Sequence, residues 1–199
     1  MQHYFIDKPH NDSDFFEFKD NVLDMELCFR SCDSIFSKNK IDDGTRSLLN
    51  VIHKKCDLYG EGLDLGCGLG VIGITLIKKF NMNFDMVDIN NTAVKLSKEN
   101  TVKNNVSDRA HVFYSDGFSD VKKEYDFIVT NPPIKTGKQL LFKLMEDSFN
   151  HLKTNGKIIL VIRKDHGMES LKKYIQSIYG NCEIIDRNKG FYILQAIKI

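Results

Sequence analysis

The spacing of apolar residues near the start of the chain predicts two short β-strands. One strand-like run covers residues 15–19, and in residues 23–30 every second residue, starting with Leu23, is a large apolar one. A period of two indicates a strand with one buried face. The polar pair Asp20 and Asn21 lies between the two runs and is typical of a turn, so we expect a β-hairpin.

From about residue 44 onward, strand-like and helix-like patterns take turns along the chain. Strands are expected over residues 63–65, 84–87, 110–114, 125–130 and 157–162, and helices over residues 71–80, 92–103, 138–152 and 168–179. Two further strands, over residues 182–186 and 191–197, close the chain and are joined by residues 187–190. Strands separated by helices indicate a parallel sheet with helices on both faces, and the closing pair indicates an antiparallel hairpin.

These patterns predict an α/β fold with one main domain. A chain of 199 residues can bury one core well but is short for two. We therefore expect a small N-terminal β-hairpin extension over residues 1–40, followed by a single α/β domain over residues 41–199.

Composition favours a globular protein of the cytoplasm. The longest unbroken apolar stretch covers only residues 158–162, far too few to cross a membrane. The polar start of the chain lacks the positively charged segment followed by an apolar segment that is typical of a signal peptide. The five cysteines are odd in number and scattered, which is typical of reduced thiols, and their spacing fits no zinc site. We expect a cytoplasmic protein without a membrane segment and without a bound metal.

The net charge of +1 hides a basic C-terminal third. Residues 135–199 contain twelve Lys or Arg and six Asp or Glu, whereas residues 1–30 contain three and seven. A positive field beside a binding site attracts phosphate-rich partners such as nucleic acid. Lysines on a helix face are, however, most often only solvated surface.

A glycine-rich segment, DLGCGLG, follows the first strand of the α/β part. Ligands bind sheets of this kind beyond the carboxyl ends of the strands. Glycines at alternate positions permit positive φ angles and close approach of the backbone to a ligand, and the next helix offers its N-terminal amides. A tight connection without any ligand gives the same pattern. The candidate cofactor residues here are Asp64, Gly66, Cys67, Gly68 and Gly70, with Cys67 interpreted as a small packing residue.

Two further candidates follow the next two strands. Asp88, beside Ile89 in the segment VDIN, is placed to accept hydrogen bonds from both hydroxyls of a ribose, although such a residue can also cap the next helix. Asp116, in the segment SDG, follows the third strand, where a side-chain oxygen can meet an exocyclic amine such as that of adenine.

The spacing of the glycines bears on which nucleoside cofactor would bind. A nicotinamide-binding turn reads GxGxxG, whereas here the glycines follow Asp64 as GxGxG. A carboxylate at the end of the strand suits a cofactor with a positive sulfonium and an ammonium group, and it would repel a pyrophosphate. We therefore expect S-adenosylmethionine, with a dinucleotide as the alternative.

The segment TNPPI, after the fourth strand, contains two of the three prolines of the chain. Consecutive prolines fix φ and give a stiff extended turn. The side-chain oxygen of Asn131 and the carbonyl of Pro132 can then accept both hydrogens of a planar NH₂ group, which aims its lone pair at a methyl carbon. Such a transfer depends on positioning and electrostatics and needs no metal and no strong base. The plain alternative is that Asn-Pro-Pro is only a turn.

Together, the motifs DLGCGLG, VDIN, SDGF and TNPPI resemble those of the class I S-adenosylmethionine-dependent methyltransferases. Within that class they resemble the methyltransferase small domain family, which includes RsmC-type ribosomal RNA guanine-N2 enzymes. The segments HYF, IFSKNKIDDGTRSLL, TNPPIKTGK and KGFYIL extend the resemblance to single-domain, YbxB-like members over nearly the whole chain.

This resemblance implies a Rossmann-like, seven-stranded, mostly parallel sheet, S-adenosylmethionine as cofactor, and a guanine amino group in small-subunit ribosomal RNA as acceptor. It matches cofactor positions to Asp64, Gly66, Gly68, Gly70, Asp88 and Asp116, and the acceptor site to Asn131, Pro132, Pro133 and Ile134. Asn131 is also expected to contact the cofactor. The partner would be ribosomal RNA or a small ribosomal subunit particle. RNA phosphates would contact basic residues near the site, such as Lys135, Lys138, Arg163 and Lys164.

The residue after the two prolines separates the possible acceptors. Related enzymes that act on adenine in nucleic acid, or on a glutamine of release factors, usually have an aromatic residue there, whereas this chain has Ile134. Both remain alternatives, as does a non-catalytic assembly factor that binds cofactor or RNA, against which the intact Asn-Pro-Pro argues. Ser34 and Asp43 depart from the family pattern, which has a glycine and an apolar residue there, and they bear on the choice of substrate.

Overall fold

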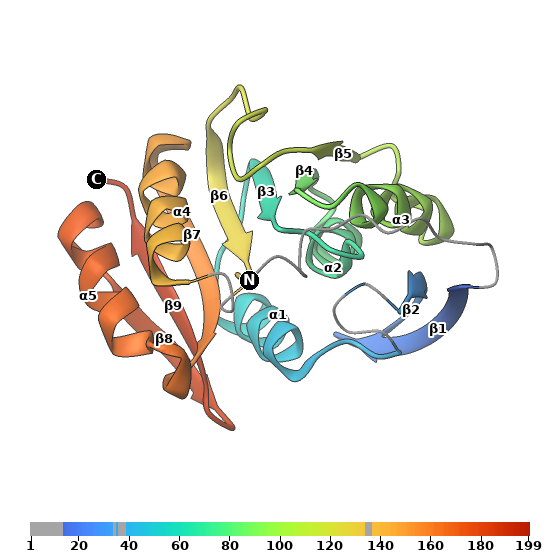
Figure 1. Ribbon diagram of the computed structural model, residues 1–199, viewed down its shortest axis with the longest axis horizontal. Helices are drawn as coiled ribbons and strands as arrows, with labels where there is room; N and C mark the ends of the chain where they lie inside the picture. The colour runs from blue at the N-terminus through green and yellow to red at the C-terminus, as the bar shows by residue number, and fades with distance from the viewer. Residues whose placement is uncertain (1–13, 34, 36–38, 134–136) are drawn as a thin grey trace.

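The computed structural model describes residues 14–33, 35, 39–133 and 137–199, and these form two β-sheets and their covering helices (Figure 1). A small sheet contains β1 (Phe15–Val22) and β2 (Met25–Cys32). A seven-stranded sheet has the order β5-β4-β3-β6-β7-β9-β8. Its strands are β3 (Glu61–Leu65), β4 (Asn83–Asp88), β5 (Ala110–Tyr114), β6 (Tyr125–Thr130), β7 (Leu152–Arg163), β8 (Glu183–Asn188) and β9 (Phe191–Ile197).

Helices cover both faces of the large sheet (Figure 1). They are α1 (Asp43–Lys55), α2 (Val71–Phe80), α3 (Asn91–Lys103), α4 (Lys138–Asn150) and α5 (Met168–Tyr179), with a 3₁₀ turn at Lys164–His166. Apolar residues of α1, α2 and α3 form one buried cluster with one face of the sheet, and those of α4 and α5 form a second cluster with the other face. Burial of the apolar surface of these two clusters is the main contribution to the stability of the fold, at about 25 cal/mol per Å² of apolar surface.

The topology confirms the predicted fold class. Strands β5, β4, β3, β6 and β7 pair in parallel, whereas β9 is antiparallel to both β7 and β8. The central strands are buried on both faces and therefore read as continuous apolar runs, as in residues 158–162. Within the described part of the chain, none of the helices is long and apolar enough to cross a membrane.

The predicted turn of the N-terminal hairpin was wrong. The strands are joined at Leu23 and Asp24, and Val22 lies opposite Met25. Both turn residues have positive φ angles, 50° and 63°, which a two-residue type I′ turn requires. Leu23 adopts this conformation with its side chain buried, so tertiary packing outweighs the local preference of the polar pair for a turn.

The Asp20 side chain, expected in that turn, instead ties the hairpin to the segment before α1. Its carboxylate accepts a hydrogen bond from the backbone N–H of Ile41 at 2.9 Å and forms an ion pair with Arg46. These contacts fix the chain just ahead of the first helix.

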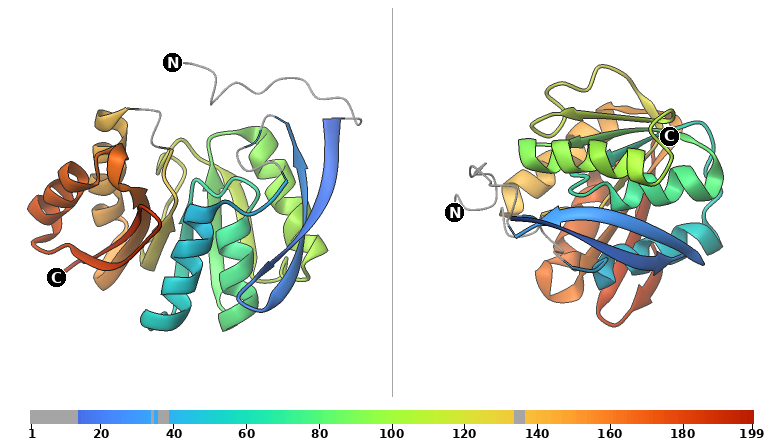
Figure 2. Two further views of the ribbon diagram at one scale, coloured as in Figure 1. Left: turned by 90° about the horizontal axis from the view of Figure 1, so that it is seen from below. Right: turned by 90° about the vertical axis from the view of Figure 1, so that its right-hand side faces the viewer.

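The hairpin lies along α3, as Figure 2 shows. Asn100 accepts a hydrogen bond from the N–H of Arg30 (2.7 Å) and donates one to its carbonyl (3.1 Å). One helical turn further, Asn104 makes the same pair of bonds with Cys28, at 3.1 and 2.7 Å. Two side-chain amides thus pair with the edge of β2 as a strand would. The expected boundary at residue 40, between the hairpin extension and the α/β domain, stays a prediction.

The sequence analysis predicted no element over residues 43–55, where the structure has α1. Asp42 caps this helix by accepting a hydrogen bond from the N–H of Thr45 at 3.0 Å. The last turn carries basic residues, which the helix dipole favours. The local signals for a helix were therefore present and were missed. The end of α4 was also placed two residues late, because β7 begins at Leu152, five residues before the predicted strand.

Candidate active site

The sheet order brings the glycine-rich turn and the Asn-Pro-Pro segment side by side. The turn follows β3 and the segment follows β6, and these strands pair in parallel with Asp64 opposite Val129. The Thr130 hydroxyl donates a hydrogen bond to the carbonyl of Leu65 at 2.8 Å, which joins the two strand ends. Two motifs more than sixty residues apart therefore meet at the carboxyl edge of the sheet. Open α/β sheets bind their ligands at this position, which we call the crevice below.

Gly66 and Gly68 present bare backbone to open space. Their φ angles are +73° and +54°, and a Cβ atom added to either would meet no atom within 4 Å. The turn is held firmly, since the N–H of Gly66 donates to the carbonyl of Val87 and that of Gly68 to the carboxylate of Asp88, both at 2.9 Å. This is the form of a cradle in which a ligand lies directly on the main chain.

Gly70 and Gly73 have a different role, because both allow α2 to approach its neighbours closely. A Cβ atom at Gly70 would lie 2.6 Å from the hydroxyl of Ser97, and one at Gly73 would lie 2.7 Å from the sulfur of Met86. The structure therefore gives Gly70 a packing function. Its predicted contact with a cofactor stays a prediction.

Asp64 is fully buried at the end of β3. One carboxylate oxygen accepts a hydrogen bond from the N–H of Gly73 at 2.9 Å, and the other, Oδ1, is buried without a hydrogen-bond partner among the described residues. Burial raises the pKa of this carboxyl to about 7, with the hydrogen bond from Gly73 lowering it and the charge of Asp88 raising it further. A buried acceptor without a donor costs free energy, so a ligand that donates a hydrogen bond to this oxygen would be favoured.

Asp88 links the glycine turn to the start of α3. Its two oxygens accept hydrogen bonds from the N–H groups of Gly68 and Asn90, each at 2.9 Å. The capping alternative for Asp88 is wrong, because Asn90 caps α3 by accepting a hydrogen bond from Ala93 at 3.1 Å. The half-buried carboxylate is thereby held at the mouth of the crevice with Ile89, which is also half-buried, next to it.

Asp116 lies on the same edge of the sheet, one strand further along. The N–H of Ser115 donates to the carbonyl of Asp88 at 3.1 Å, which places the loop after β5 beside the end of β4. The Ser115 hydroxyl is used inside the loop, donating to Gly117 and accepting from Asp120, while the Asp116 side chain is exposed.

Burial keeps the Cys67 thiol in its protonated form. It is buried in the glycine turn, 3.9 Å from the hydroxyl of Ser97. Burial raises its pKa well above the ordinary value, and the nearby carboxylates of Asp88 and Asp64 add to the effect. A thiol that stays protonated fits the interpretation of Cys67 as a packing residue.

The Asn131 side chain is held by two residues that the sequence analysis did not single out. Its Nδ2 donates one hydrogen bond to Asp42 Oδ1 at 3.2 Å and another to Thr45 Oγ1 at 3.0 Å. A carboxylate only accepts, so the nitrogen must face α1 and the oxygen must face away from it. The only sequence signal for this contact was the capping pattern that begins α1.

Pro132 is buried and Pro133 half-buried. Ile134 and Lys135 lie outside the described residues. Of the other basic residues expected near the site, Lys138 begins α4, directly after the acceptor segment, with its ammonium 5.1 Å from the centre of the Phe142 ring. Arg163 ends β7, where its guanidinium lies 5.5 Å from the centre of the Phe191 ring.

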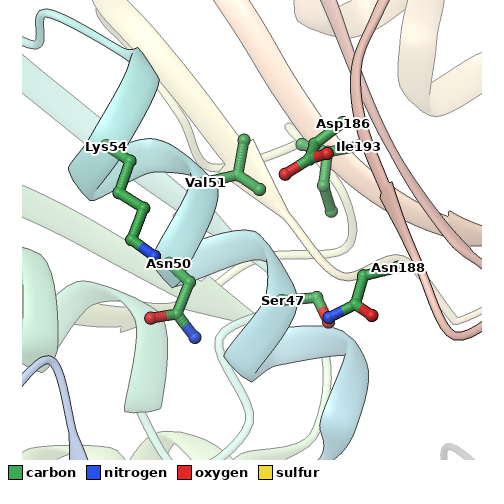
Figure 3. Close-up of a pocket in the computed structure, with 7 residues that line it drawn as sticks. All are labelled: Ser47, Asn50, Val51, Lys54, Asp186, Asn188 and Ile193. Carbon is green, nitrogen blue, oxygen red and sulfur yellow. The ribbon is translucent and has the colours of Figure 1, made fainter.

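A cavity of about 240 Å³ lies between α1 and the β8–β9 pair (Figure 3). It is lined by Ser47, Asn50, Val51, Lys54, Asp186, Asn188 and Ile193. None of the predicted site residues lines it, so this cavity is separate from the crevice.

The fold and the crevice together define a class of protein. A sheet of this order, with a glycine-rich turn after its first strand and Asn-Pro-Pro after its fourth, is that of an S-adenosylmethionine-dependent methyltransferase. The chain belongs to the methyltransferase small domain family, whose family model matches residues 26–195.

Individual relatives agree with this assignment. The chain is 33% identical to the uncharacterized protein YbxB of Bacillus subtilis over 201 residues, which covers 100% of this chain and 99% of the relative. It is also 33% identical to ribosomal RNA small subunit methyltransferase C of Vibrio cholerae over 192 residues, which covers 91% of this chain and 53% of the relative. The chain thus spans about half the length of that enzyme.

Among solved structures, the chain resembles the 16S rRNA N2 methyltransferase RsmC of T. thermophilus, which was solved in complex with AdoMet and guanosine. The TM-score is 0.85 at 20% sequence identity, and the match covers 96% of this chain and 52% of the other. At this identity the likeness shows the shared fold.

S-adenosylmethionine is the cofactor of the family, and the residues of the crevice fit it. Gly66 and Gly68 leave the space that a ligand needs along the backbone. The unpartnered oxygen of Asp64 is a buried hydrogen-bond acceptor, and the positive charges of this cofactor would favour the ionised form of that carboxyl. Because the two features are independent, their agreement supports the assignment on structural grounds.

Proposed function

We propose that the protein transfers a methyl group from S-adenosylmethionine to the exocyclic N2 amine of a guanine in 16S-type ribosomal RNA. The observation that carries this proposal is the orientation of Asn131. Both hydrogens of its amide are donated to Asp42 and Thr45 at the start of α1, so its oxygen is available to an amine in the crevice next to the glycine turn. The ribosomal RNA methyltransferases among its relatives support the choice of acceptor.

Residues around the glycine turn would hold the cofactor. The backbone of Gly66 and Gly68 would lie against it, Asp64 Oδ1 would accept a hydrogen bond from its ammonium, and Asp88 would accept from the ribose hydroxyls. Ile89 and Asp116 would border the base. When bound, S-adenosylmethionine supplies an electrophilic methyl carbon on a positively charged sulfur.

Asn131 and Pro132 would hold the acceptor. The Oδ1 of Asn131 and the carbonyl of Pro132 each accept one hydrogen of the guanine amino group, which moves its nitrogen from planar toward tetrahedral geometry. The lone pair, otherwise delocalised into the ring, then becomes available for an in-line attack. No strong base is needed, because the surplus proton can leave to water after the attack.

The RNA would be held mainly through its phosphates. Three basic residues lie at element ends on the same edge of the sheet as Asn131. Arg163 ends β7, Lys164 follows it, and Lys138 begins α4. Contacts of this kind are sensitive to salt and do not read sequence, so the shape of the RNA or of a ribosomal particle would select the site. A guanine inside a helix would have to be flipped out to reach Asn131. Action on ribosomal RNA implies a cytoplasmic location.

A parallel labelling assay tests the proposal. The purified protein is incubated with methyl-labelled S-adenosylmethionine and, separately, with small ribosomal subunits, naked 16S rRNA and a release factor, and labelled RNA is digested to nucleosides. We expect label in N2-methylguanosine. Label in N6-methyladenosine or in the release factor would assign the site to another amine, and cofactor binding without transfer would favour a non-catalytic assembly factor.

A further inference from the structure

We propose that Asp42 and Thr45, at the start of α1, act as positioning residues that orient the Asn131 amide for methyl transfer. This inference rests on the proposed function, since it gives the Asn131 oxygen the task of accepting a hydrogen bond from the acceptor amine. We refer to the three side chains as the Asn131 clamp.

The geometry of the clamp allows one orientation of the amide. The two hydrogens on Asn131 Nδ2 are donated to Asp42 Oδ1 at 3.2 Å and to Thr45 Oγ1 at 3.0 Å. Rotation of the amide by 180° would set its oxygen against the carboxylate, which repels it and has no hydrogen to donate. Asp42 therefore selects the rotamer in which Oδ1 is presented to the crevice.

The clamp also affects the strength of the Asn131 oxygen as an acceptor. An amide that donates to a carboxylate is polarised, because hydrogen bonds in a chain reinforce one another. The amine nitrogen gains positive charge as it attacks, and a more negative Oδ1 stabilises that charge. The effect belongs to the transition state, so loss of the clamp should lower kcat more than it raises KM.

Asp42 and Thr45 are both held on a rigid support. Thr45 is buried, and α1 packs with its apolar side against β7 and β9. The Asp42 carboxylate is held in place by the hydrogen bond that it accepts from the N–H of Thr45 at 3.0 Å, and a Cβ atom at Gly44 would lie only 3.0 Å from its Oδ1. A group held by the helix in this way can fix a rotamer on a neighbouring strand end.

The hydroxyl of Thr45 separates this role from helix capping. Asp42 Oδ1 serves two purposes, since it also accepts the capping hydrogen bond from the N–H of Thr45. The Thr45 hydroxyl, in contrast, is hydrogen-bonded to Asn131 alone among the described residues. Replacing it with valine therefore tests the clamp and leaves the cap of α1 in place.

The first test compares Thr45→Val with Thr45→Ser. We expect Thr45→Val to lower kcat about tenfold, the effect of one hydrogen bond, with the Kd of S-adenosylmethionine unchanged, and Thr45→Ser to restore most of the rate. Thr101→Val is the matched control, because Thr101 is also a buried helical threonine but its hydroxyl bonds within α3. Equal kcat in wild type and Thr45→Val would overturn the proposal.

A second measurement keeps the clamp testable if no RNA is methylated. The side-chain NH₂ signal of Asn131 is identified in an NMR spectrum by its loss in Asn131→Asp, and its hydrogen exchange is measured in each variant. We expect slow exchange in wild type and Thr45→Ser and at least tenfold faster exchange in Thr45→Val. Unchanged exchange in Thr45→Val would contradict the clamp. If the wild-type protein shows slow exchange but transfers no methyl group to RNA, only the proposed function is refuted.

Discussion

At the scale of single residues, the four glycines around the first βα turn divide into two pairs. Gly66 and Gly68 border open space, whereas Gly70 and Gly73 lie against side chains of α3 and β4. The sequence pattern gave Gly66, Gly68 and Gly70 the same expected role and did not single out Gly73. Their separate roles become visible only when the space around each Cβ position is known.

This division predicts opposite consequences for two alanine substitutions. Gly68→Ala should weaken binding of S-adenosylmethionine at least tenfold, because the methyl group enters the open space, with a stability loss of about 1 kcal/mol from the positive φ angle. Gly73→Ala should cost about 1–3 kcal/mol of stability through overlap with Met86 and change the affinity less. Calorimetric titration and thermal unfolding measure both. Equal loss of affinity in the two variants would contradict the division.

Asp64 predicts a dependence of stability on pH. Its pKa is about 7 in the folded protein against 3.8 as the ordinary value, so the folded state binds the extra proton and its stability falls as pH rises from about 4 to 7. Asp64→Asn removes the charge. The variant should therefore gain stability over wild type by a few kcal/mol at pH 8, with no such gain near pH 4.

The same substitution should weaken binding of S-adenosylmethionine, because the buried negative acceptor is lost. Thermal unfolding between pH 4 and 8, with and without cofactor, measures both effects. The assignment of Asp64 fails if the variant binds the cofactor as tightly as wild type does.

At the scale of secondary-structure elements, local patterns predicted most of the sheet and its helices. The bounds of α2, β5, β6, α5 and β9 match the expected ranges, because each has a clear apolar period between polar or glycine boundaries. The hairpin turn did not follow local preference, since burial of Leu23 decides it. The clamp could not be predicted either, because Thr45 and Asn131 are 86 positions apart and meet only through the order of the strands.

The docking of the hairpin on α3 predicts a matched pair of variants. Asn100 and Asn104 each pair with the backbone of β2, but only Asn100 also donates to the carbonyl of Leu69 in the glycine turn, at 3.0 Å. Each alanine substitution should cost about 1–3 kcal/mol of stability, because buried backbone groups lose their partners. Asn100→Ala should weaken cofactor binding as well, whereas Asn104→Ala should leave it unchanged. Equal cofactor affinity in both variants would show that Asn100 does not support the turn.

At the scale of the whole molecule, function follows from the order of the strands. The pairing of β3 with β6 puts the glycine-rich turn next to Asn131, and α1 packs over β7 and β9 so that its first turn reaches the same place. Three segments, each unremarkable alone, thereby form one site. The basic C-terminal third supplies Lys138, Arg163 and Lys164 at that edge of the sheet, where a negatively charged acceptor would approach.

The proposed function gives Asn131 the acceptor amine and gives the residues of the glycine turn the cofactor. The most direct measurement is the rate of methyl transfer to small ribosomal subunits by wild type and Asn131→Ala, together with the Kd of S-adenosylmethionine for each. We expect the rate to fall at least about a hundredfold, as for loss of a transition-state hydrogen bond, with the Kd within about threefold of wild type. Transfer by Asn131→Ala at the wild-type rate would contradict this role of Asn131, and no label in N2-methylguanosine from wild type would contradict the proposed acceptor.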